Sequence, residues 1–173
     1  RDKDQLAAWE AVRKHLIAYD RKYRYRGPSG RIDISDEQTR DDSIRLALHK
    51  AKSSDNLEPA VVTELTDKTF KVVVLDGKEL KTLDLDADSR KFAGKYLTNK
   101  VAKEKRLQVG SIIRVSRVKK GWTLSQIPEV QAGFISVDFD TGAVKSLVGG
   151  FDFYLNMFNH VTQALRQPGS SFK

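Results

Sequence analysis

Residues 60–86, AVVTELTDKTFKVVVLDGKELKTLDLD, carry the clearest structural pattern of the chain. Runs rich in valine, leucine and threonine are typical of β-strands, and polar breaks near Asp67 and at Asp76-Gly77 divide the stretch into three. An Asp-Gly pair between apolar runs is the strongest short signal for a β-hairpin. Alternate residues should face the interior, and four side chains are expected there: Val72, Val74, Ile113 and Val115. The stretch predicts three antiparallel strands joined by tight turns.

The sequence that follows extends this sheet. Residues 87–97, ADSRKFAGKYL, resemble a short helix, and residues 111–128, SIIRVSRVKKGWTLSQIP, form two further strands around a Lys-Gly turn. Three strands, a short helix and two strands occur in this order in a small five-stranded OB-type barrel. We therefore predict an α+β fold in which an OB-like antiparallel β-barrel is flanked by helices.

Two amphipathic helices are predicted before the sheet. In residues 4–21, apolar side chains recur at three- and four-residue steps with Arg13, Lys14 and Asp20 between them. The apolar positions of this helix are Leu6, Trp9, Val12, Leu16 and Tyr19. The second helix is expected to begin at a capping box formed by Ser35 and Gln38. Its apolar stripe is Ile44, Ala47, Leu48 and Ala51.

Composition narrows the class of protein. The 173 residues carry a net charge of +8, which favours an acidic partner such as nucleic acid, an anionic membrane or an acidic polymer. There is no cysteine, so disulfides, thiolate nucleophiles and Cys-zinc sites are excluded. No run approaches the roughly 20 apolar residues that span a bilayer, and the opening RDKDQ is not signal-like. The protein is then cytosolic, or its export signal lies outside this sequence.

Metal and cofactor sites are not predicted. Residues 84–95, DLDADSRKFAGK, begin like a calcium loop, but Ser89 stands where glycine is needed and Lys95 where a bidentate glutamate is needed. The simpler interpretation is that the aspartates of this stretch lie at the end of a strand and stabilise the N-terminus of a short helix. The three histidines, His15, His49 and His160, have no metal-ligand spacing. No glycine-rich phosphate loop is present, so we expect neither metal nor cofactor.

A basic and aromatic loop follows the first helix and raises the possibility of nucleic-acid binding. Residues 19–31, YDRKYRYRGPSGR, interleave tyrosines with arginines and lysine, as single-strand binding surfaces do. The alternative is a loop whose tyrosines pack on neighbouring helices. The predicted barrel strands offer only Phe70 and Trp122 as stacking surfaces, so we expect no nucleic-acid partner.

The C-terminal sequence resembles the class A penicillin-binding proteins, the bifunctional enzymes of bacterial cell-wall synthesis. Four segments carry the resemblance: a D-x-x-T-G-A-V hairpin at 138–144, V-G-G at 148–150, Phe158-Asn159, and QALRQPGSSFK at 163–173. The family usually has arginine where His160 stands, and the FYLN that precedes Met157 is atypical. The last segment ends on Ser170 and Lys173, a Ser-x-x-Lys motif.

The resemblance extends upstream. Residues 7–28, AAWEAVRKHLIAYDRKYRYRGP, are similar to the helix and basic-aromatic segment that join the glycosyltransferase of this family to the remainder. In the family a barrel-like domain is inserted at the place where we predict the barrel. We therefore expect three parts: a linker helix, loop and second helix at 1–58, an OB-like barrel at 59–129, and the incomplete N-terminal edge of a transpeptidase domain at 130–173.

The resemblance also implies a function. Ser170 would be the nucleophile and Lys173 the group that activates it, while the companion S-D-N and K-T-G elements lie downstream of the serine in this family, and neither follows it here. The parent would polymerise glycan strands, cross-link D-Ala-D-Ala stem peptides and bind β-lactams. It would act at the periplasmic side of the inner membrane, with its membrane anchor and glycosyltransferase outside this sequence. The alternative is a non-enzymatic OB-like module that docks a regulator or a cell-wall polymer.

Overall fold

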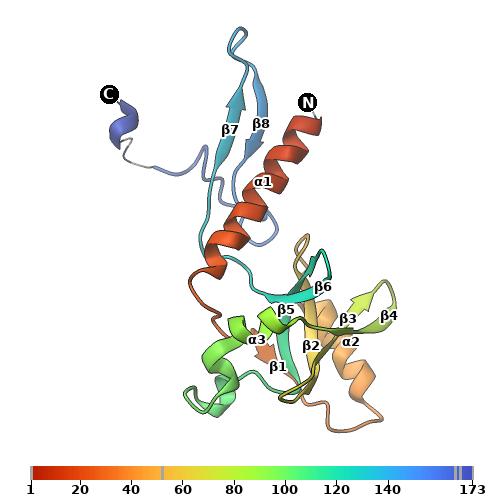
Figure 1. Cartoon of the computed structure of the whole chain (residues 1–173). Coiled ribbons are helices and arrows are strands. Elements are labelled where there is room, and N and C mark those ends of the chain that lie inside the picture. The colour runs from red at the N-terminus through yellow and green to blue at the C-terminus, as the bar shows by residue number, and fades with distance from the viewer. Residues whose placement is uncertain (1, 52, 166, 168, 173) are drawn as a thin grey trace. The chain divides into compact units, whose positions relative to one another are not determined.

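The structure is a computed structural model that describes residues 2–51, 53–165, 167 and 169–172 (Figure 1). The chain divides into two compact units. One unit combines Arg1–Asp20 with Pro128–Lys173, and the other is Arg21–Ile127.

The second unit is built on one antiparallel sheet. Its strands are β1 (Gly30–Arg31), β2 (Glu58–Leu65), β3 (Phe70–Asp76), β4 (Glu79–Asp84), β5 (Ser111–Val118) and β6 (Gly121–Ser125). The strand order is β1-β5-β2-β3-β4, and β6 pairs with β5. Strand β3 pairs with β4 so that Asp76 is opposite Glu79, which puts the turn at Gly77 and Lys78. Gly77 has φ of 63°, a left-handed conformation that glycine adopts without steric cost.

The two ends of this sheet curl toward each other. Within the described residues, Leu85, which directly follows β4, forms one parallel bridge with Trp122 of β6, and beside it the Asp86 N–H donates to the Trp122 carbonyl at 3.0 Å. Helix α3 (Ala87–Ala93) and the 3₁₀ turn η1 (Gly94–Leu97) follow, where a short helix was predicted. The OB-like fold prediction is thus confirmed, in the form of a strongly curved sheet.

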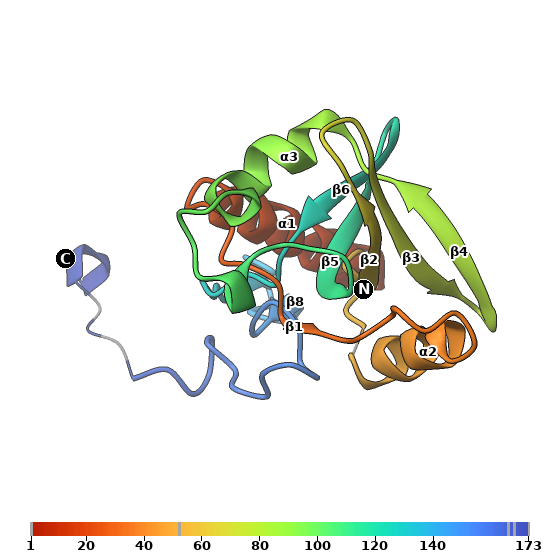
Figure 2. The ribbon, with the colours of Figure 1, turned by 90° about the horizontal axis from the view of Figure 1, so that it is seen from below.

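Apolar side chains fill both faces of β2 and β3. Val72, Val74, Ile113 and Val115 are all buried in the interior cluster, as predicted. On the opposite face, Val61 and Val73 pack against Ile44 and Leu48 of α2 (Arg40–Lys50). Figure 2 shows α2 and α3 on different sides of the sheet. Because these strands are covered on both faces, apolar residues follow one another at 60–62 and 72–75.

The predicted capping box is wrong. Helix α2 has Thr39 at its N-cap, without a side-chain cap. The Ser35 hydroxyl and N–H both donate to Asp33 Oδ1, at 2.7 and 2.9 Å, and the Gln38 N–H donates to Asp36 Oδ1 at 3.0 Å. Two aspartates therefore satisfy these groups in local turns before the helix begins, in the way that short acidic side chains compete with capping.

The first unit contains the long helix α1 (Asp2–Arg21, of which Arg21 belongs to the second unit) and a two-stranded sheet of β7 (Phe134–Val137) and β8 (Val144–Val148). Gln5 joins them, because its amide accepts from the Leu147 N–H and donates to the Leu147 carbonyl, both at 2.9 Å. A 3₁₀ turn, η3 (Gly169–Phe172), lies near the end of the chain.

The apolar stripe predicted for α1 is only partly buried. Leu16 is buried, whereas Leu6 and Tyr19 are exposed. Two residues placed between the apolar positions, Arg13 and Asp20, are buried instead. The sequence pattern therefore identified the helix but misjudged which of its side chains contact the remainder of the unit.

Candidate functional site

The predicted nucleophile, Ser170, lies in the short 3₁₀ turn η3 and is exposed. Gly169 precedes it in a left-handed conformation with φ of 56°. The predicted activating group, Lys173, lies outside the described residues. The pairing of these two side chains therefore stays a prediction.

The D-x-x-T-G-A-V segment forms a tight turn built around Asp138. The Asp138 carboxylate accepts from the backbone N–H groups of Asp140 and Thr141 and from the Thr141 hydroxyl, at 2.9–3.2 Å. Lys145 approaches the second carboxylate oxygen at 2.8 Å. The bonds from Lys145 and Thr141 lower the pKa of Asp138 to about 2. Gly142 closes the turn with φ of 70°, where a side chain would be strained.

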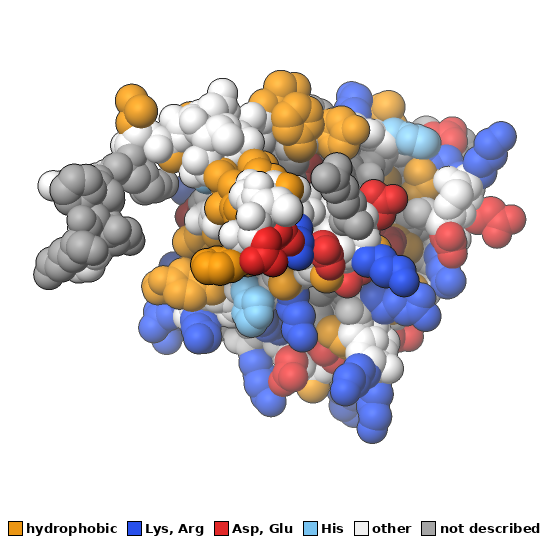
Figure 3. Space-filling view, turned by 90° about the horizontal axis from the view of Figure 1, so that it is seen from above, with side chains coloured by type: hydrophobic (Ala, Val, Ile, Leu, Met, Phe, Trp, Pro, Cys, Tyr) orange, Lys and Arg blue, Asp and Glu red, His pale blue; other side chains and the backbone are white. Residues whose placement is uncertain are grey.

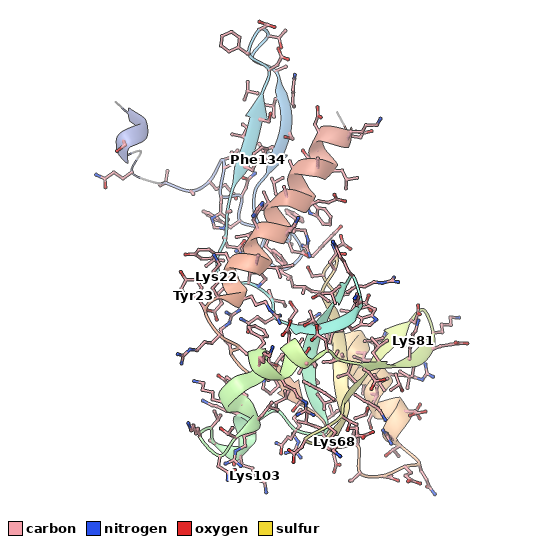
Figure 4. The ribbon with its side chains drawn as sticks, in the orientation of Figure 1. Lys22, Tyr23, Lys68, Lys81, Lys103 and Phe134 are labelled. Atoms are coloured by element: carbon pink, nitrogen blue, oxygen red, sulfur yellow. The ribbon has the colours of Figure 1, made fainter. Side chains whose placement is uncertain are left out.

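The hairpin on this turn is under-packed. Four side chains of β7 and β8 are between 43 and 50% exposed: Phe134, Ile135, Val137 and Val144. Phe139, at the turn, is fully exposed. Phe134 is marked in Figure 4, and the face seen from above in Figure 3 carries several hydrophobic side chains. A two-stranded sheet of this kind is marginally stable alone, so its apolar residues are suited to pack on further sheet.

The V-G-G and Phe-Asn segments meet in space. The His160 N–H donates to the Gly149 carbonyl at 2.7 Å. A Cβ atom on Gly149 would lie 2.7 Å from the Asn159 side chain, closer than real Cβ contacts. Glycine is therefore required where Asn159 covers the backbone. Asn159 is fixed in turn, because its Oδ1 accepts from the Val161 N–H at 2.9 Å.

A buried arginine that the sequence pattern did not identify connects this region to α1. The Arg13 guanidinium lies between the rings of Trp9 and Phe151, at 4.9 and 4.1 Å from their centroids. It donates to the Phe151 carbonyl at 2.8 Å and lies 3.6 Å from the Asp152 carboxylate. Only 2% of Arg13 is exposed. A cation between two rings is stabilised by their electron-rich faces, and burial strengthens that attraction.

The basic-aromatic loop is folded onto the OB-like unit. Tyr25 is buried and contacts the rings of Phe92 and Tyr96 at 5.5 and 5.4 Å. Burial, with the neighbouring Tyr96, raises the pKa of the Tyr25 hydroxyl. Arg21 donates to the Leu124 carbonyl at 2.7 Å, and Arg26 donates to the Ile127 carbonyl at 2.6 Å. Much of the loop therefore serves packing, although Tyr23 is exposed.

The stretch that resembled a calcium loop forms a polar network under α3. The Asp86 carboxylate caps α3 by accepting from the Ser89 N–H at 2.9 Å, and it also accepts from the Ser89 and Thr123 hydroxyls at 2.6 and 2.9 Å. Burial raises the pKa of Asp86, but these bonds outweigh it and the net shift is downward. Within the described residues, no cluster of three or more His, Asp or Glu side chains is placed to hold a metal ion.

A cleft of about 630 Å³ lies between α2 and β5. Its apolar lining includes Ile32, Leu46 and Ile112, and its charged groups are Asp33, Lys50 and Arg114. Both signs of charge occur in this lining, so it does not indicate one class of ligand.

The tripeptide S-D-N does occur in this chain, at Ser54-Asp55-Asn56. It precedes Ser170 in the sequence, whereas the family element follows the serine. It forms a tight turn in which the Leu57 N–H donates to the Ser54 carbonyl at 2.7 Å and Asn56 has φ of 63°. The segment is therefore a turn into β2.

None of the helices in the part of the chain that the structure describes combines the length and apolar character needed to cross a membrane. A protein-family profile described as "Penicillin-binding protein OB-like domain" matches residues 25–130.

Full-length relatives and a solved structure match beyond that region. Penicillin-binding protein 1A of Neisseria lactamica is 40% identical over 169 residues, and that of Pseudomonas aeruginosa is 41% identical over 182 residues. Each alignment covers 98% of this chain and 21% of the relative, so the chain spans about a fifth of the length of these curated relatives. The crystal structure of penicillin-binding protein 1A from Haemophilus influenzae matches with a TM-score of 0.80 and 30% identity, over 99% of this chain and 24% of that one.

Proposed function

The chain belongs to the family of penicillin-binding proteins that carry an OB-like domain, and from this premise we propose that it works as part of a bifunctional peptidoglycan synthase. One observation carries the proposal. Similarity to penicillin-binding protein 1A extends over 98% of the chain, through both units and not only the OB-like region. The synthase polymerises glycan strands and cross-links their peptides at the periplasmic side of the inner membrane.

In this proposal Ser170 is the nucleophile of the cross-linking reaction. Its Oγ forms a bond to the carbonyl carbon of the penultimate D-alanine, and the terminal D-alanine leaves with its amine protonated. An amine of a second peptide then takes the acyl group and restores the serine. The same acyl-serine chemistry explains trapping by a β-lactam. Its ring amide bond opens when the serine attacks, and the nitrogen stays attached to the acyl group, so no amine departs.

A serine hydroxyl needs a base, because it is a poor nucleophile near neutral pH. We assign Lys173 as the group that receives the Ser170 proton. A free lysine has a pKa of about 10.4 and is protonated at pH 7. It can accept a proton only where burial or nearby cations lower that pKa, or where it passes the proton to another group.

The exposed apolar residues of β7 and β8 support a parent protein that carries a transpeptidase domain. They fit the edge of a larger sheet, and such a sheet would belong to a transpeptidase domain. The isolated chain of 173 residues has no K-T-G element. We therefore expect it to be inactive by itself.

The proposal is tested with a fluorescent penicillin on the full-length protein that contains this chain. Full-length protein should be labelled covalently, Ser170→Ala should lose the label, and the adjacent Ser171→Ala should keep it. The isolated chain should remain unlabelled. Label that survives Ser170→Ala would refute the nucleophile, and label on the isolated chain would refute the need for further elements.

A further inference from the structure

The positive charge of this protein is concentrated in one part of the sequence. Residues 89–128 contain eleven lysines and arginines and only one acidic residue, Glu104, so this segment carries a net charge of +10. The remaining residues together carry a net charge of −2. The basic character of the whole chain is therefore a property of the second half of the OB-like unit.

The connection between α3 and β5 forms a built scaffold inside this segment. Leu107 is buried, and its N–H donates to the Tyr96 carbonyl at 2.9 Å. Arg106 ties the loop to itself, because its Nε donates to the Val101 carbonyl at 2.6 Å and its Nη1 to Asn99 Oδ1 at 2.8 Å. One arginine and one leucine thus hold the backbone. Of the lysine side chains in the connection, Lys95 lies with its Nζ 5.3 Å from the centre of the Tyr96 ring.

Four lysines project from this connection: Lys95, Lys100, Lys103 and Lys105. We call them the lysine loop. All four are exposed, and no ion pair joins any of them to a carboxylate among the described residues. Figure 4 marks Lys103 at the outer end of the unit, with its side chain directed away from the sheet. Four ammonium groups within residues 95–105 create a local positive potential that attracts an anionic partner.

We propose that the lysine loop binds a polymer that carries repeated carboxylates, namely the peptide-bearing glycan of the cell wall. Lysine ammonium groups are strongly hydrated point charges on flexible stems, which suits carboxylates at variable positions better than one fixed bidentate partner. The identity of this polymer rests on the proposed function, whereas the position of the site rests on the charge distribution and the loop geometry.

Two other anionic partners fit the loop less well. Its large apolar residues are buried or half-buried apart from Val109, so the loop offers little apolar surface for insertion into a lipid bilayer. Its aromatic residue, Tyr96, is half-buried against Tyr25 and cannot serve as an open platform for stacked bases.

The test is co-sedimentation of the 173-residue chain with purified, insoluble peptidoglycan. The loop variant replaces all four lysines of the lysine loop by glutamine. The matched control replaces four exposed lysines elsewhere on the same unit, Lys68, Lys78, Lys119 and Lys120, by glutamine. Both variants lower the net charge from +8 to +4, so only the position of the charge differs.

We expect the loop variant to lose affinity on the order of tenfold and the control variant to remain close to the native chain. Binding should weaken as salt screens the charges, and should disappear when the carboxylates of the polymer are converted to amides. Equal losses in both variants, or binding that survives amidation, would overturn the proposal. Tighter binding to phosphatidylglycerol vesicles or single-stranded DNA than to peptidoglycan would also overturn it.

The outcome is separable from the proposed function. The same four substitutions in the full-length protein should leave labelling by fluorescent penicillin at Ser170 unchanged. Native protein that is labelled but does not bind the polymer would refute the lysine loop alone, and native protein that binds the polymer but is not labelled would refute the synthase proposal alone.

Discussion

Replacing Ser89 by alanine should destabilise the OB-like unit more than an ordinary buried serine-to-alanine change. The Ser89 side chain is fully buried, donates to Asp86 Oδ1 at 2.6 Å and accepts from the Leu124 N–H at 2.7 Å. In Ser89→Ala the Leu124 N–H is left in the core without this acceptor, at a cost of about 1–3 kcal/mol. Loss of the bond to a charged carboxylate adds about 1 kcal/mol. We expect a total loss of about 2–4 kcal/mol.

Hydrogen exchange at the amides of β5 and β6 measures this loss within the unit concerned. Exchange at the Leu124 amide should accelerate about 30- to 700-fold, since each 1.4 kcal/mol is tenfold in an equilibrium constant. Ser116→Ala on β5 is the matched control, because Ser116 is half-buried and should change stability by less than about 0.5 kcal/mol. If Ser89→Ala and Ser116→Ala accelerate exchange equally, the hydrogen-bond reasoning is wrong.

The same network makes a prediction about pH. The pKa of Asp86 is lowered in the folded chain, because the bonds from Ser89 and Thr123 outweigh burial. A lowered carboxyl pKa contributes stability that is fully present above the unfolded value of about 3.9 and is lost as the pH falls through the folded value. The difference in exchange between native chain and Ser89→Ala should therefore shrink as the pH is brought below about 4. A constant difference down to about pH 2 would contradict this.

Three further predictions concern single side chains. Arg13→Ala should destabilise the first unit by about 3–5 kcal/mol in urea unfolding, because it removes the buried cation beside the Asp152 carboxylate, which is only 11% exposed; Arg13→Lys should recover part of this. Gly110→Ala should cost more than about 3 kcal/mol because φ is 84° and the new Cβ would strike a backbone carbonyl, whereas Gly121→Ala, with φ of 119° and open space, should cost about 1–3 kcal/mol from backbone strain alone. The carboxyl of Asp138 should titrate by NMR at about 2, and Lys145→Gln should move it upward toward 3.8.

The sheet of the OB-like unit could be predicted because its sequence signals are local. The Asp76-Gly77 pair puts a two-residue turn between β3 and β4, and alternation then assigns Val72 and Val74 to the interior. Only the position of the turn differs by one residue, since Gly77 and Lys78 are its central pair. Turn geometry and alternation fix the register without information from distant residues.

The predictions of burial on α1 are wrong where a side chain contacts residues that are distant in the sequence. Arg13 is buried because Phe151 and Asp152, far along the chain, supply a ring, a carbonyl and a carboxylate for it. Asp20 is buried where the Glu129 N–H donates to its carboxylate at 3.1 Å. Helical periodicity classifies both residues as polar and therefore exposed. It contains no information on partners that are more than one hundred positions away.

In the candidate site too, features set by local sequence could be predicted, and features set by distant segments could not. The Ser-x-x-Lys motif is recognisable as a short string, and its resemblance gives Ser170 a role that local structure alone does not indicate. In the sequence, Ser89 stands out only as the residue that rules out a calcium loop, yet it is the centre of the Asp86 network. A serine one turn after a predicted N-cap aspartate was the available signal, and its importance depends on β6, which the sequence places much later.

The segments that carried the family resemblance are themselves mostly structural. Asp138 and Gly142 build a turn, and Gly149 gives Asn159 the space to cover the backbone. This turn is stabilised by its own hydrogen bonds and by Lys145, so it does not depend on a neighbouring sheet to define its register. The hairpin can therefore keep its pairing while Ile135 and Val137 remain exposed. An edge that holds its register before it is covered can direct the addition of further strands, which is the role that the proposed transpeptidase domain requires of it.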